Sequence, residues 1–579
     1  MTSAATASAS ASASAAGAAA APAAVPAWVA PDIPDSIKAS FGAWIKGNAQ
    51  VEAAKAELHL YKRSGYFQGA AVGNVPNLPL AQAWAALQAG SNLGTPPHHA
   101  AKTRPEERAT MGTALNRSDG KIGIIRLVSL HREGDAPAHR RGSWISSWFS
   151  GAGSGGGSSS SSKSAQHGAD GSSTTPVASA VGRSASTSCG EPRMVNVLEV
   201  GTPEPKPDET KIVLLHGYGA GTAFFFQNIN SLASIPNSRL FALDWLGMGR
   251  SSRPPFSIPN SVIKQGVEAR VKAAESFFVD SLEEWRAKME IERMTIVAHS
   301  LGGYLSLAYA LRFPQRVEKI VLVSPAGIGA NPQDSQSGMA FRSKNNASAD
   351  ATQELRDTQA AIAPTTQAQQ EESRAEMRRA ASSSADVRGA TPKGPVSPTT
   401  AEEDAELERQ SPPQLSNRTR AVLSWLWDQN MSPFAIVRAS TFLGPMMVAR
   451  YTSRRFGLLQ DDDLRALHAY CHGIFTAKGS SEYCLAHILA PGAFARWPMV
   501  ERISPLTMPI SFIYGQYDWM DVNGGKAAVK ALAAAGNKFA ECNVVPLAGH
   551  HTYLDNPDAC NEVVEAFLKK PLPAGQTAA

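Results

Sequence analysis

Residues 297–304 read VAHSLGGY, and this stretch decides the fold. It follows a run rich in β-branched residues and continues into GGYLSLAYAL, so the pattern predicts a strand, a tight turn and a helix. In a nucleophile elbow, such a turn exposes a serine at the carboxyl end of a strand, and the positions two before and two after it must be very small. Around Ser300 these positions are Ala298, where the motif usually has glycine, and Gly302. The stretch predicts either a nucleophilic serine or a turn that is merely packed with small side chains.

Apolar runs recur on both sides of this turn. They lie at 211–217, 239–247, 294–300, 317–327, 508–515 and 538–549. Runs that are apolar at nearly every position are typical of strands buried on both faces. Helical patterns at 261–289 and 302–314 alternate with them, and 123–130 with 194–201 reads as an antiparallel hairpin. This order predicts an α/β fold, with a mostly parallel central sheet flanked by helices.

A serine that attacks a carbonyl group needs backbone N–H donors for the oxyanion that forms. The residue after the nucleophile, Leu301, is one expected donor. The other is expected from the loop after the first buried strand, which reads LLHGYGAG at 214–221 and makes Tyr218 the candidate. The alternative for this loop is a plain glycine-rich turn.

A serine hydroxyl also needs a base. The segment LAGHHTYLD at 547–555 follows the last predicted strand and offers His550 or His551. We favour His550, because it directly follows the Ala-Gly turn; the alternative is an ordinary pair of surface histidines.

The base in turn needs a carboxylate to orient it. The segment YGQYDWMD at 514–521 ends the preceding strand and places Asp518 close to the strand end, with Asp521 as its competitor. The chain order Ser300, Asp518, His550 is the order of α/β-hydrolases.

These motifs are identified with one subfamily of α/β-hydrolases. The segments LLHGYGAG, LDWLGMGRSSRP (243–254), VAHSLGGYLSLAYALRFPQRVEKIVLVSPAGI (297–328) and AGHHTYLD resemble the subfamily of the lipid-droplet lipase coactivator, the N-acyl-phospholipid lipase and the fungal cardiolipin-specific deacylases. The resemblance continues in 431–456 and 494–503, which are similar to the subfamily's cap. It implies a phospholipid substrate and a peripheral membrane location.

The resemblance also bears on single residues. Ser300 fills a position that is not serine in the coactivator, so the chain resembles a catalyst. The motif YDWMD is similar to the fungal deacylases, whereas the animal relatives keep an acid at the Asp521 position only. His550 and Asp555 match the H-x4-D pattern that the subfamily shares with glycerophospholipid acyltransferases. Because His550 is already needed as the triad base, Asp555 is expected to buttress the loop.

Three functions remain open at this point. The first is a phospholipid deacylase that works through an acyl-enzyme and needs no metal or cofactor. The second is a lysophosphatidic acid acyltransferase that uses acyl-CoA as co-substrate. The third is a non-catalytic scaffold that recruits a lipase.

Composition divides the 579 residues into globular and low-complexity parts. The polar stretches have too few large apolar side chains to offset the entropy of ordering, so we expect them to be disordered. The predicted division is a disordered Ala/Ser-rich tail at 1–35, an N-terminal helical extension at 36–118, the hydrolase core at 119–130 and 191–330, disordered inserts at 131–190 and 331–416, a helical cap at 417–505, and the second part of the core at 506–571.

Charge and targeting signals narrow the setting further. The net charge is +5, and the sequence contains no basic stripe with interleaved aromatic residues, so nucleic acid is not an expected partner. Five scattered cysteines without a C-x-x-C pair favour a reducing compartment and argue against a zinc site. The acid-poor N-terminus favours a mitochondrial location, with the lipid droplet and endoplasmic reticulum as alternatives. The apolar and basic side chains of 420–456, and the helix at 36–62 with Trp44, are candidate membrane contacts.

Overall fold

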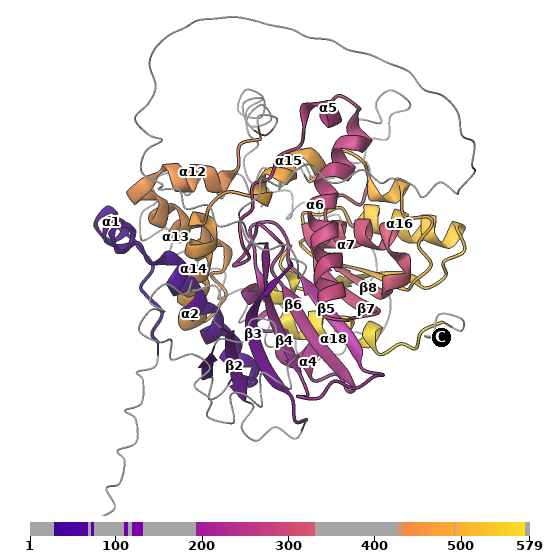
Figure 1. Ribbon diagram of the computed structural model, residues 1–579, viewed down its shortest axis with the longest axis horizontal. Helices are drawn as coiled ribbons and strands as arrows, with labels where there is room; N and C mark the ends of the chain where they lie inside the picture. The colour runs from indigo at the N-terminus through magenta and orange to yellow at the C-terminus, as the bar shows by residue number, and fades with distance from the viewer. Residues whose placement is uncertain are drawn as a thin grey trace, which may run out of the picture.

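The computed structural model describes residues 28–67, 71–73, 109–113, 119–130, 193–329, 427, 430–490 and 493–573. The segments predicted to be disordered at 131–190 and 331–416, and residues 1–27 of the predicted tail, lie outside the described residues. Ten strands of the described part form one sheet in the order β1-β2-β3-β4-β6-β5-β7-β8-β9-β10 (Figure 1).

The parallel part of the sheet forms where the buried apolar runs were predicted. Its strands are β5 (Thr210–Leu215), β6 (Ser238–Leu243), β7 (Met294–His299), β8 (Val317–Val323), β9 (Ile510–Gly515) and β10 (Ala540–Val545). Each pairs in parallel with its neighbours in the order β6-β5-β7-β8-β9-β10. The predicted fold class, a mostly parallel sheet flanked by helices, is confirmed.

The other end of the sheet is antiparallel. β3 (Ile122–Ser129) and β4 (Met194–Gly201) pair as the predicted hairpin, and β4 continues onto β6. Two further strands, β1 (Ala71–Gly73) and β2 (Ala109–Thr113), extend this end. The prediction of a helical extension over 36–118 is therefore wrong for these two segments, because both add to the sheet by backbone pairing.

Helices cover both faces of the sheet. Their bounds are α1 (Ile37–Lys46), α2 (Ala49–Tyr61), α4 (Ile229–Ala233), α5 (Asn260–Ile263), α6 (Val267–Lys288), α7 (Leu301–Arg312), α12 (Pro433–Ala439), α13 (Gly444–Arg455), α14 (Asp461–Thr476), α15 (Leu485–Ile488), α16 (Val522–Ala534), α17 (Thr552–Asp555) and α18 (Pro557–Leu568). Short 3-10 turns are η1 (Lys62–Ser64), η4 (Thr222–Phe225), η5 (Pro314–Arg316), η7 (Thr441–Leu443), η8 (Ser481–Cys484) and η9 (Met499–Glu501). The helical pattern predicted at 261–289 divides into α5 and α6 around Gly266, whose φ is 111°.

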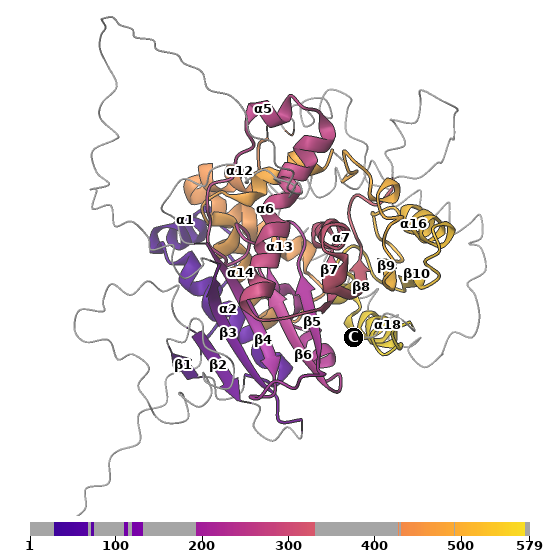
Figure 2. The same ribbon diagram turned by 45° about the vertical axis from the view of Figure 1, so that its right-hand side comes forward.

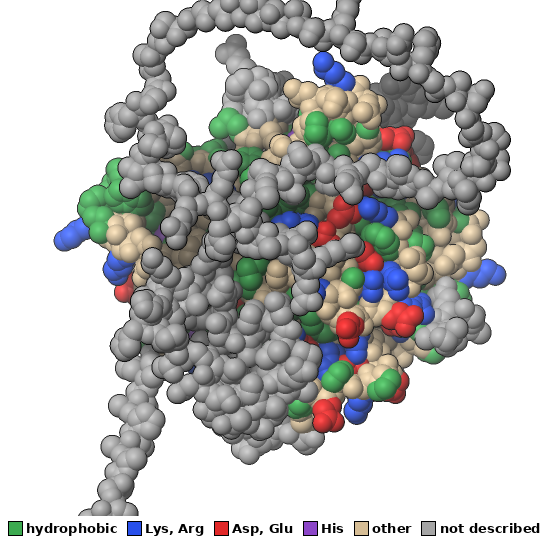
Figure 3. Space-filling view, in the orientation of Figure 1, with side chains coloured by type: hydrophobic (Ala, Val, Ile, Leu, Met, Phe, Trp, Pro, Cys, Tyr) green, Lys and Arg blue, Asp and Glu red, His purple; other side chains and the backbone are tan. Residues whose placement is uncertain are grey.

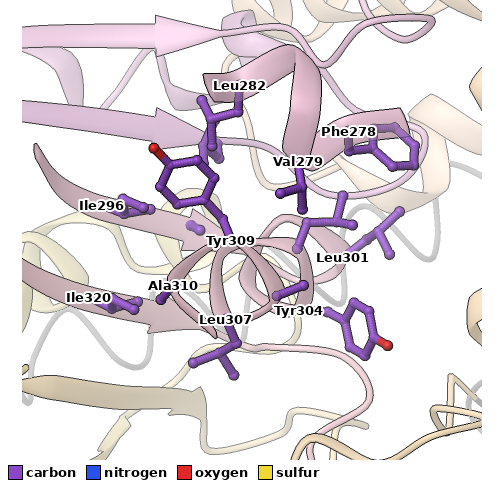
Figure 4. Packing of buried hydrophobic residues seen from close by; sticks show 14 of the residues in the cluster. Phe278, Val279, Leu282, Ile296, Leu301, Tyr304, Leu307, Tyr309, Ala310 and Ile320 are labelled. Atoms are coloured by element: carbon purple, nitrogen blue, oxygen red, sulfur yellow. The ribbon is translucent and has the colours of Figure 1, made fainter. Parts of the chain in front are cut away.

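Alternate residues of each central strand enter different cores, as the two-residue period of a strand requires. On β5, Ile212 and Leu214 face the core that includes α2, α14 and α18, whereas Val213 and Leu215 face the core of α6 and α7. Figure 4 shows the second core, where Leu301 and Tyr309 of α7 lie toward Val279 and Leu282 of α6, and Leu307 lies on the opposite side of α7.

The segment between β8 and β9 supplies the helices α12–α15. Both ribbon views place α13 and α14 beside α1 and α2 at the antiparallel side of the sheet (Figures 1 and 2). The crossing of α2 and α14 is close, because a Cβ atom on Gly473 would lie 2.4 Å from the Cβ of Ala53 and 2.6 Å from the carbonyl oxygen of Ala49. None of the described helices combines the length and the apolar character that crossing a bilayer would require.

Candidate active site

Ser300 stands on a strained turn between β7 and α7. Its φ of 52° and ψ of −120° lie in a region that residues with side chains rarely adopt. The turn is tight against the neighbouring strand, since a Cβ atom on Gly302 would lie 2.5 Å from the carbonyl oxygen of His216. Ala298 is 1% exposed and fits the other small position of the motif. The elbow geometry thus forms with alanine in place of the usual glycine.

Three side chains from distant parts of the chain form one line of hydrogen bonds. The Nε2 atom of His550 lies 3.1 Å from the Oγ of Ser300, and its Nδ1 lies 3.2 Å from the Oδ1 of Asp518. When Nδ1 carries the proton and donates a hydrogen bond to the carboxylate, Nε2 is unprotonated and can accept a hydrogen bond from the serine hydroxyl. Ser300 is 8% exposed and His550 is 5% exposed, so the line is largely shielded from water.

Asp518 is held in its charged form. Burial of the carboxylate acts to raise its pKa, but the hydrogen bond and the charge interaction with His550 outweigh burial and lower the pKa from its ordinary value. The N–H group of Met520 also donates to Asp518 Oδ1, at 3.0 Å. A charged carboxylate at this position would stabilise a protonated imidazole at His550.

The alternative residues have other partners. Asp521 accepts the N–H of Asn523 at 2.9 Å as the N-cap of α16, and His551 contacts the guanidinium of Arg455 through Nδ1. Asp555 accepts the N–H of Gly549 at 3.0 Å, directly before His550. The structure therefore brings together Ser300, His550 and Asp518, and it places Asp555 as a support of the histidine loop.

His299 is a further support that the sequence patterns did not single out. Its Nε2 lies 3.0 Å from the carbonyl oxygen of His550. Since a carbonyl can only accept, Nε2 is the protonated nitrogen. Burial, with a contribution from His550, places the pKa of His299 well below its ordinary value, so the ring is neutral. His299 therefore fixes the backbone of the base from the position next to the nucleophile.

The loop expected to supply an oxyanion donor lies against Ser300. A Cβ atom on Gly217 would lie 2.8 Å from the Cβ of Ser300, so only glycine permits this approach. The next residue is Tyr218, and its ring stacks on Phe434 of α12 with ring centres 5.2 Å apart. Leu301 is the first residue of α7, where a backbone N–H has no partner within its own helix. Both predicted donors thus belong to segments that border the serine.

A buried polar network holds that loop from below. Asp244 accepts the N–H of Thr222 at 2.7 Å and the side-chain amide of Asn196 at 2.9 Å. Glu57 of α2 accepts hydrogen bonds from the hydroxyl of Thr222 at 3.0 Å and from the same Asn196 amide at 2.9 Å. It also accepts one from the guanidinium of Arg250. Glu57 and Asp244 are both 0% exposed. Sequence reasoning missed Glu57. For Asp244 and Arg250, the available signal was the motif LDWLGMGRSSRP, which contains both.

His216 connects this network to the loop. Its Nε2 accepts the N–H of Trp245 at 3.1 Å, so its Nδ1 is protonated and donates to the carbonyl of Gly217 at 2.7 Å. Burial lowers the pKa of His216 to about 4, which keeps this donor and acceptor pattern fixed at neutral pH.

Two cavities flank the site. The first cavity is lined by Pro325, Gly327, Ile328, Gly329, Ala493, Phe494, Trp519, Met520 and Asp521. The ring of Trp519 also lies 4.9 Å from that of His550, so this cavity adjoins the triad on its histidine side. The second cavity is lined by Tyr218, Gly219, Ala220, Met248, Gly249, Arg253, Phe434, Ile474, Phe475 and Glu482. It extends from the loop at Tyr218 and Gly219 to the helices α12 and α14, which supply Phe434, Ile474 and Phe475.

One group of described residues has the spacing of metal ligands. Atoms of His59, Asp462 and Asp463 all lie within 4.8 Å of one another. The guanidinium of Arg63 lies 2.8 Å from Asp463 and 3.4 Å from Asp462, so the acidic charge there already has a cation.

Comparison with known proteins gives consistent matches. A family model described as the alpha/beta hydrolase fold matches residues 211–557. A probable 1-acylglycerol-3-phosphate O-acyltransferase of Oryza sativa subsp. japonica is 30% identical, over 66% of this chain and 72% of that protein. The (lyso)-N-acylphosphatidylethanolamine lipase of Mus musculus is 27% identical, over 63% of this chain and 80% of the lipase. The 1-acylglycerol-3-phosphate O-acyltransferase ABHD5 of Rattus norvegicus is 26% identical, over 62% of this chain and 76% of that protein.

Proposed function

The chain belongs to the α/β-hydrolase fold family, and from this premise we propose that it is a serine hydrolase that cleaves fatty-acyl esters of phospholipids at a membrane surface. In substrate type it would be a deacylase of cardiolipin or N-acyl-phospholipids. The observation that carries the proposal is the hydrogen-bonded line from Ser300 through His550 to Asp518.

The proposed reaction is acyl transfer through an acyl-enzyme. His550 takes the proton of the Ser300 hydroxyl as Oγ attacks the ester carbonyl, and Asp518 stabilises the imidazolium that results. The N–H groups of Leu301 and Tyr218 receive the negative charge that develops on the carbonyl oxygen. His550 then gives its proton to the leaving lysolipid oxygen. Water, deprotonated by the same histidine, releases the fatty acid and restores the serine.

The names of relatives support a phospholipid substrate. The mouse protein is named a lipase of N-acylphosphatidylethanolamine, and the rice and rat proteins are named acyltransferases of an acylglycerol phosphate. All three names describe acyl groups on phosphate-bearing glycerolipids, which is the chemical class proposed here.

An exposed apolar surface supports work at a membrane. Its side chains project from α1 and η7, with exposures of 60% for Ile37, 46% for Phe41, 47% for Trp44, 62% for Ile45, 37% for Phe442 and 36% for Leu443. Figure 3 shows hydrophobic side chains gathered at the left, where Figure 1 places α1. The two elements are joined, because the Ser40 hydroxyl of α1 donates to the carbonyl oxygen of Phe442 in η7, at 2.5 Å. Such a surface would sit among headgroups while the rest of the protein stays in water.

A fluorophosphonate probe tests the serine first. We expect the wild-type chain to be labelled and Ser300→Ala to remain unlabelled; absence of labelling in both would favour a non-catalytic scaffold. The substrate is then tested by lipidomics of mixed phospholipid liposomes, with Ser300→Ala as the control. Release of fatty acid and lysophospholipid by the wild type alone supports the proposal, and no difference between the two proteins contradicts it.

A second candidate is a lysophosphatidic acid acyltransferase. It is favoured by the names of the rice and rat relatives and by the match of His550 and Asp555 to the H-x4-D pattern. In that reaction the lysolipid hydroxyl would replace water in the second half, and acyl-CoA would be the acyl donor. Release of free CoA from acyl-CoA only when lysophosphatidic acid is present would support this candidate over the deacylase.

A further inference from the structure

The second cavity contains a cation that the reaction just described does not use. Arg253 lines it, and its guanidinium is held by backbone carbonyl groups: Nη1 donates to Gly247 at 2.7 Å, and Nη2 donates to Gly249 at 2.6 Å and to Ile474 at 3.4 Å. These acceptors are uncharged. They fix the position of the guanidinium but leave its positive charge to be balanced from elsewhere.

The acidic residue of the cavity is already paired. Glu482 lines the same cavity and accepts two bonds from Arg438, at 3.2 Å to Nη1 and 2.5 Å to Nη2. Glu482 therefore forms its ion pair with Arg438 and not with Arg253. Burial lowers the pKa of Arg253 to about 10 although the charges of Glu482 and Asp244 oppose this change, which indicates a cation that is incompletely compensated.

The cavity lies within reach of the nucleophile. It begins at Tyr218 and Gly219, and the preceding residue, Gly217, touches Ser300. One wall is apolar, because Phe434 stacks on Tyr218 at 5.2 Å and on Phe475 at 4.6 Å between ring centres. Apolar walls exclude water and strengthen the attraction between a fixed cation and an anion.

We propose that this cavity binds the phosphate group of the lipid substrate and that Arg253 is the cation that receives it. An arginine has five N–H donors, and the three bonds of Arg253 to carbonyl groups leave two of them to donate to phosphate oxygens. In a glycerophospholipid, only a few bonds separate the ester carbonyl from the phosphate, so the carbonyl can lie at Ser300 while the phosphate lies beyond Tyr218. This inference rests on the proposed function and adds the position of the headgroup.

The test compares two substrates with the same acyl chain. One is a lysophosphatidylethanolamine and the other an uncharged monoacylglycerol, and kcat/KM is measured for both. In Arg253→Met we expect the ratio of the phospholipid value to the monoacylglycerol value to fall about 10- to 100-fold, the range for losing a buried charge-assisted bond. Arg312→Met, which removes a guanidinium 41% exposed on the surface, is the matched control and should keep the wild-type ratio. An equal loss of kcat/KM on both substrates would overturn the proposal, because it would show that Arg253 only stabilises the fold and does not bind the phosphate.

A second variant covers the case in which Arg253→Met does not fold. Glu482→Gln removes the negative charge of the cavity and keeps the shape of the side chain, so the KM for the phospholipid should fall severalfold relative to that for the monoacylglycerol. An unchanged or raised relative KM would count against the phosphate site.

Competition separates a lipid headgroup from a free anion. Hydrolysis of p-nitrophenyl butyrate by the wild type should be inhibited more strongly by glycerol 3-phosphate than by inorganic phosphate, and Arg253→Met should lose most of this inhibition. Stronger inhibition by inorganic phosphate, with an unchanged substrate ratio in Arg253→Met, would mark a free-anion site and overturn the proposal. Fluorophosphonate labelling of Ser300 is scored in parallel. Its absence in the wild type refutes the hydrolase itself, whereas labelled protein with equal substrate losses refutes only the headgroup site.

Discussion

Removal of the Glu57 carboxylate should destabilise the folded protein. In Glu57→Ala, the buried hydroxyl of Thr222 and the buried amide of Asn196 lose an acceptor, and the guanidinium of Arg250 loses its carboxylate partner. Breaking a buried charged pair from one side costs about 3–5 kcal/mol of the free energy of unfolding.

The lower end of that range applies here, for two reasons. The side chain of Arg250 is 25% exposed, so water can solvate part of its charge in the variant. Burial raises the pKa of Glu57, and the neighbouring carboxylate of Asp244 adds to this rise against the effect of Arg250, so the substitution also relieves a repulsion. We therefore expect a loss of about 3 kcal/mol.

The assay is urea unfolding of the full chain, followed by circular dichroism. Lys55→Ala on the same helix is the control: its ammonium is 48% exposed and its pairing with Glu52 is a surface interaction, worth less than about 1 kcal/mol. A change below about 1 kcal/mol in Glu57→Ala, similar to that of the control, would refute the assignment of Glu57 as a buried anchor.

Three other predictions follow from the site. Asp518→Asn should lower kcat by about 10⁴-fold, as expected when the base loses its orienting carboxylate. Asp521→Asn keeps a good N-cap for α16 and should change kcat little. If steady-state kinetics show the larger loss of kcat in Asp521→Asn, the third member of the triad is Asp521. Gly302→Ala should lose more than about 2 kcal/mol and most of the fluorophosphonate labelling, because the new Cβ would lie 2.5 Å from the carbonyl of His216; wild-type stability and labelling would contradict the tight elbow. The free energy of unfolding should also fall as pH drops from about 6.5 toward 4.5, because burial holds the pKa of His216 at about 4 and that of His468 at about 3, so the unfolded chain binds protons that the native chain does not. Each group accounts for up to about 1.4 kcal/mol per pH unit. A denaturation midpoint that stays constant over this range, or an unchanged slope of stability against pH in His468→Gln, would contradict this prediction.

Patterns that are local in the sequence were enough for the parallel sheet. Strands β5 to β9 are nearly continuous apolar runs, and such runs predict burial on both faces without knowledge of their partners. The edge strand β10 reads AECNVV and is mostly half-exposed, so the expectation of burial on both faces is wrong for it. The elbow at Ser300 and the segments with His550 and Asp518 follow from strand ends, because parallel strands bring their carboxyl ends to one edge.

The features that sequence reasoning missed depend on contacts between distant segments. Glu57 lies on α2, and its partners Asn196, Thr222 and Arg250 are 139, 165 and 193 positions away. β1 is three residues long and carries no alternation from which a strand could be predicted. In each case the decisive energy comes from a partner that a window of neighbouring residues does not contain.

The close crossing of α2 and α14 has a consequence for anyone who trims this protein for expression. The family match begins at residue 211, yet Ala53 presses against Gly473 within it, and the carboxylate beneath the loop that borders the nucleophile is supplied from the same early helix. A fragment cut to the matched boundaries would expose the groove on α14 and leave Arg250 without its buried acid. A fragment that keeps these contacts should therefore start before Ala49, where α2 begins, and the border drawn by homology is not the border of the folding unit.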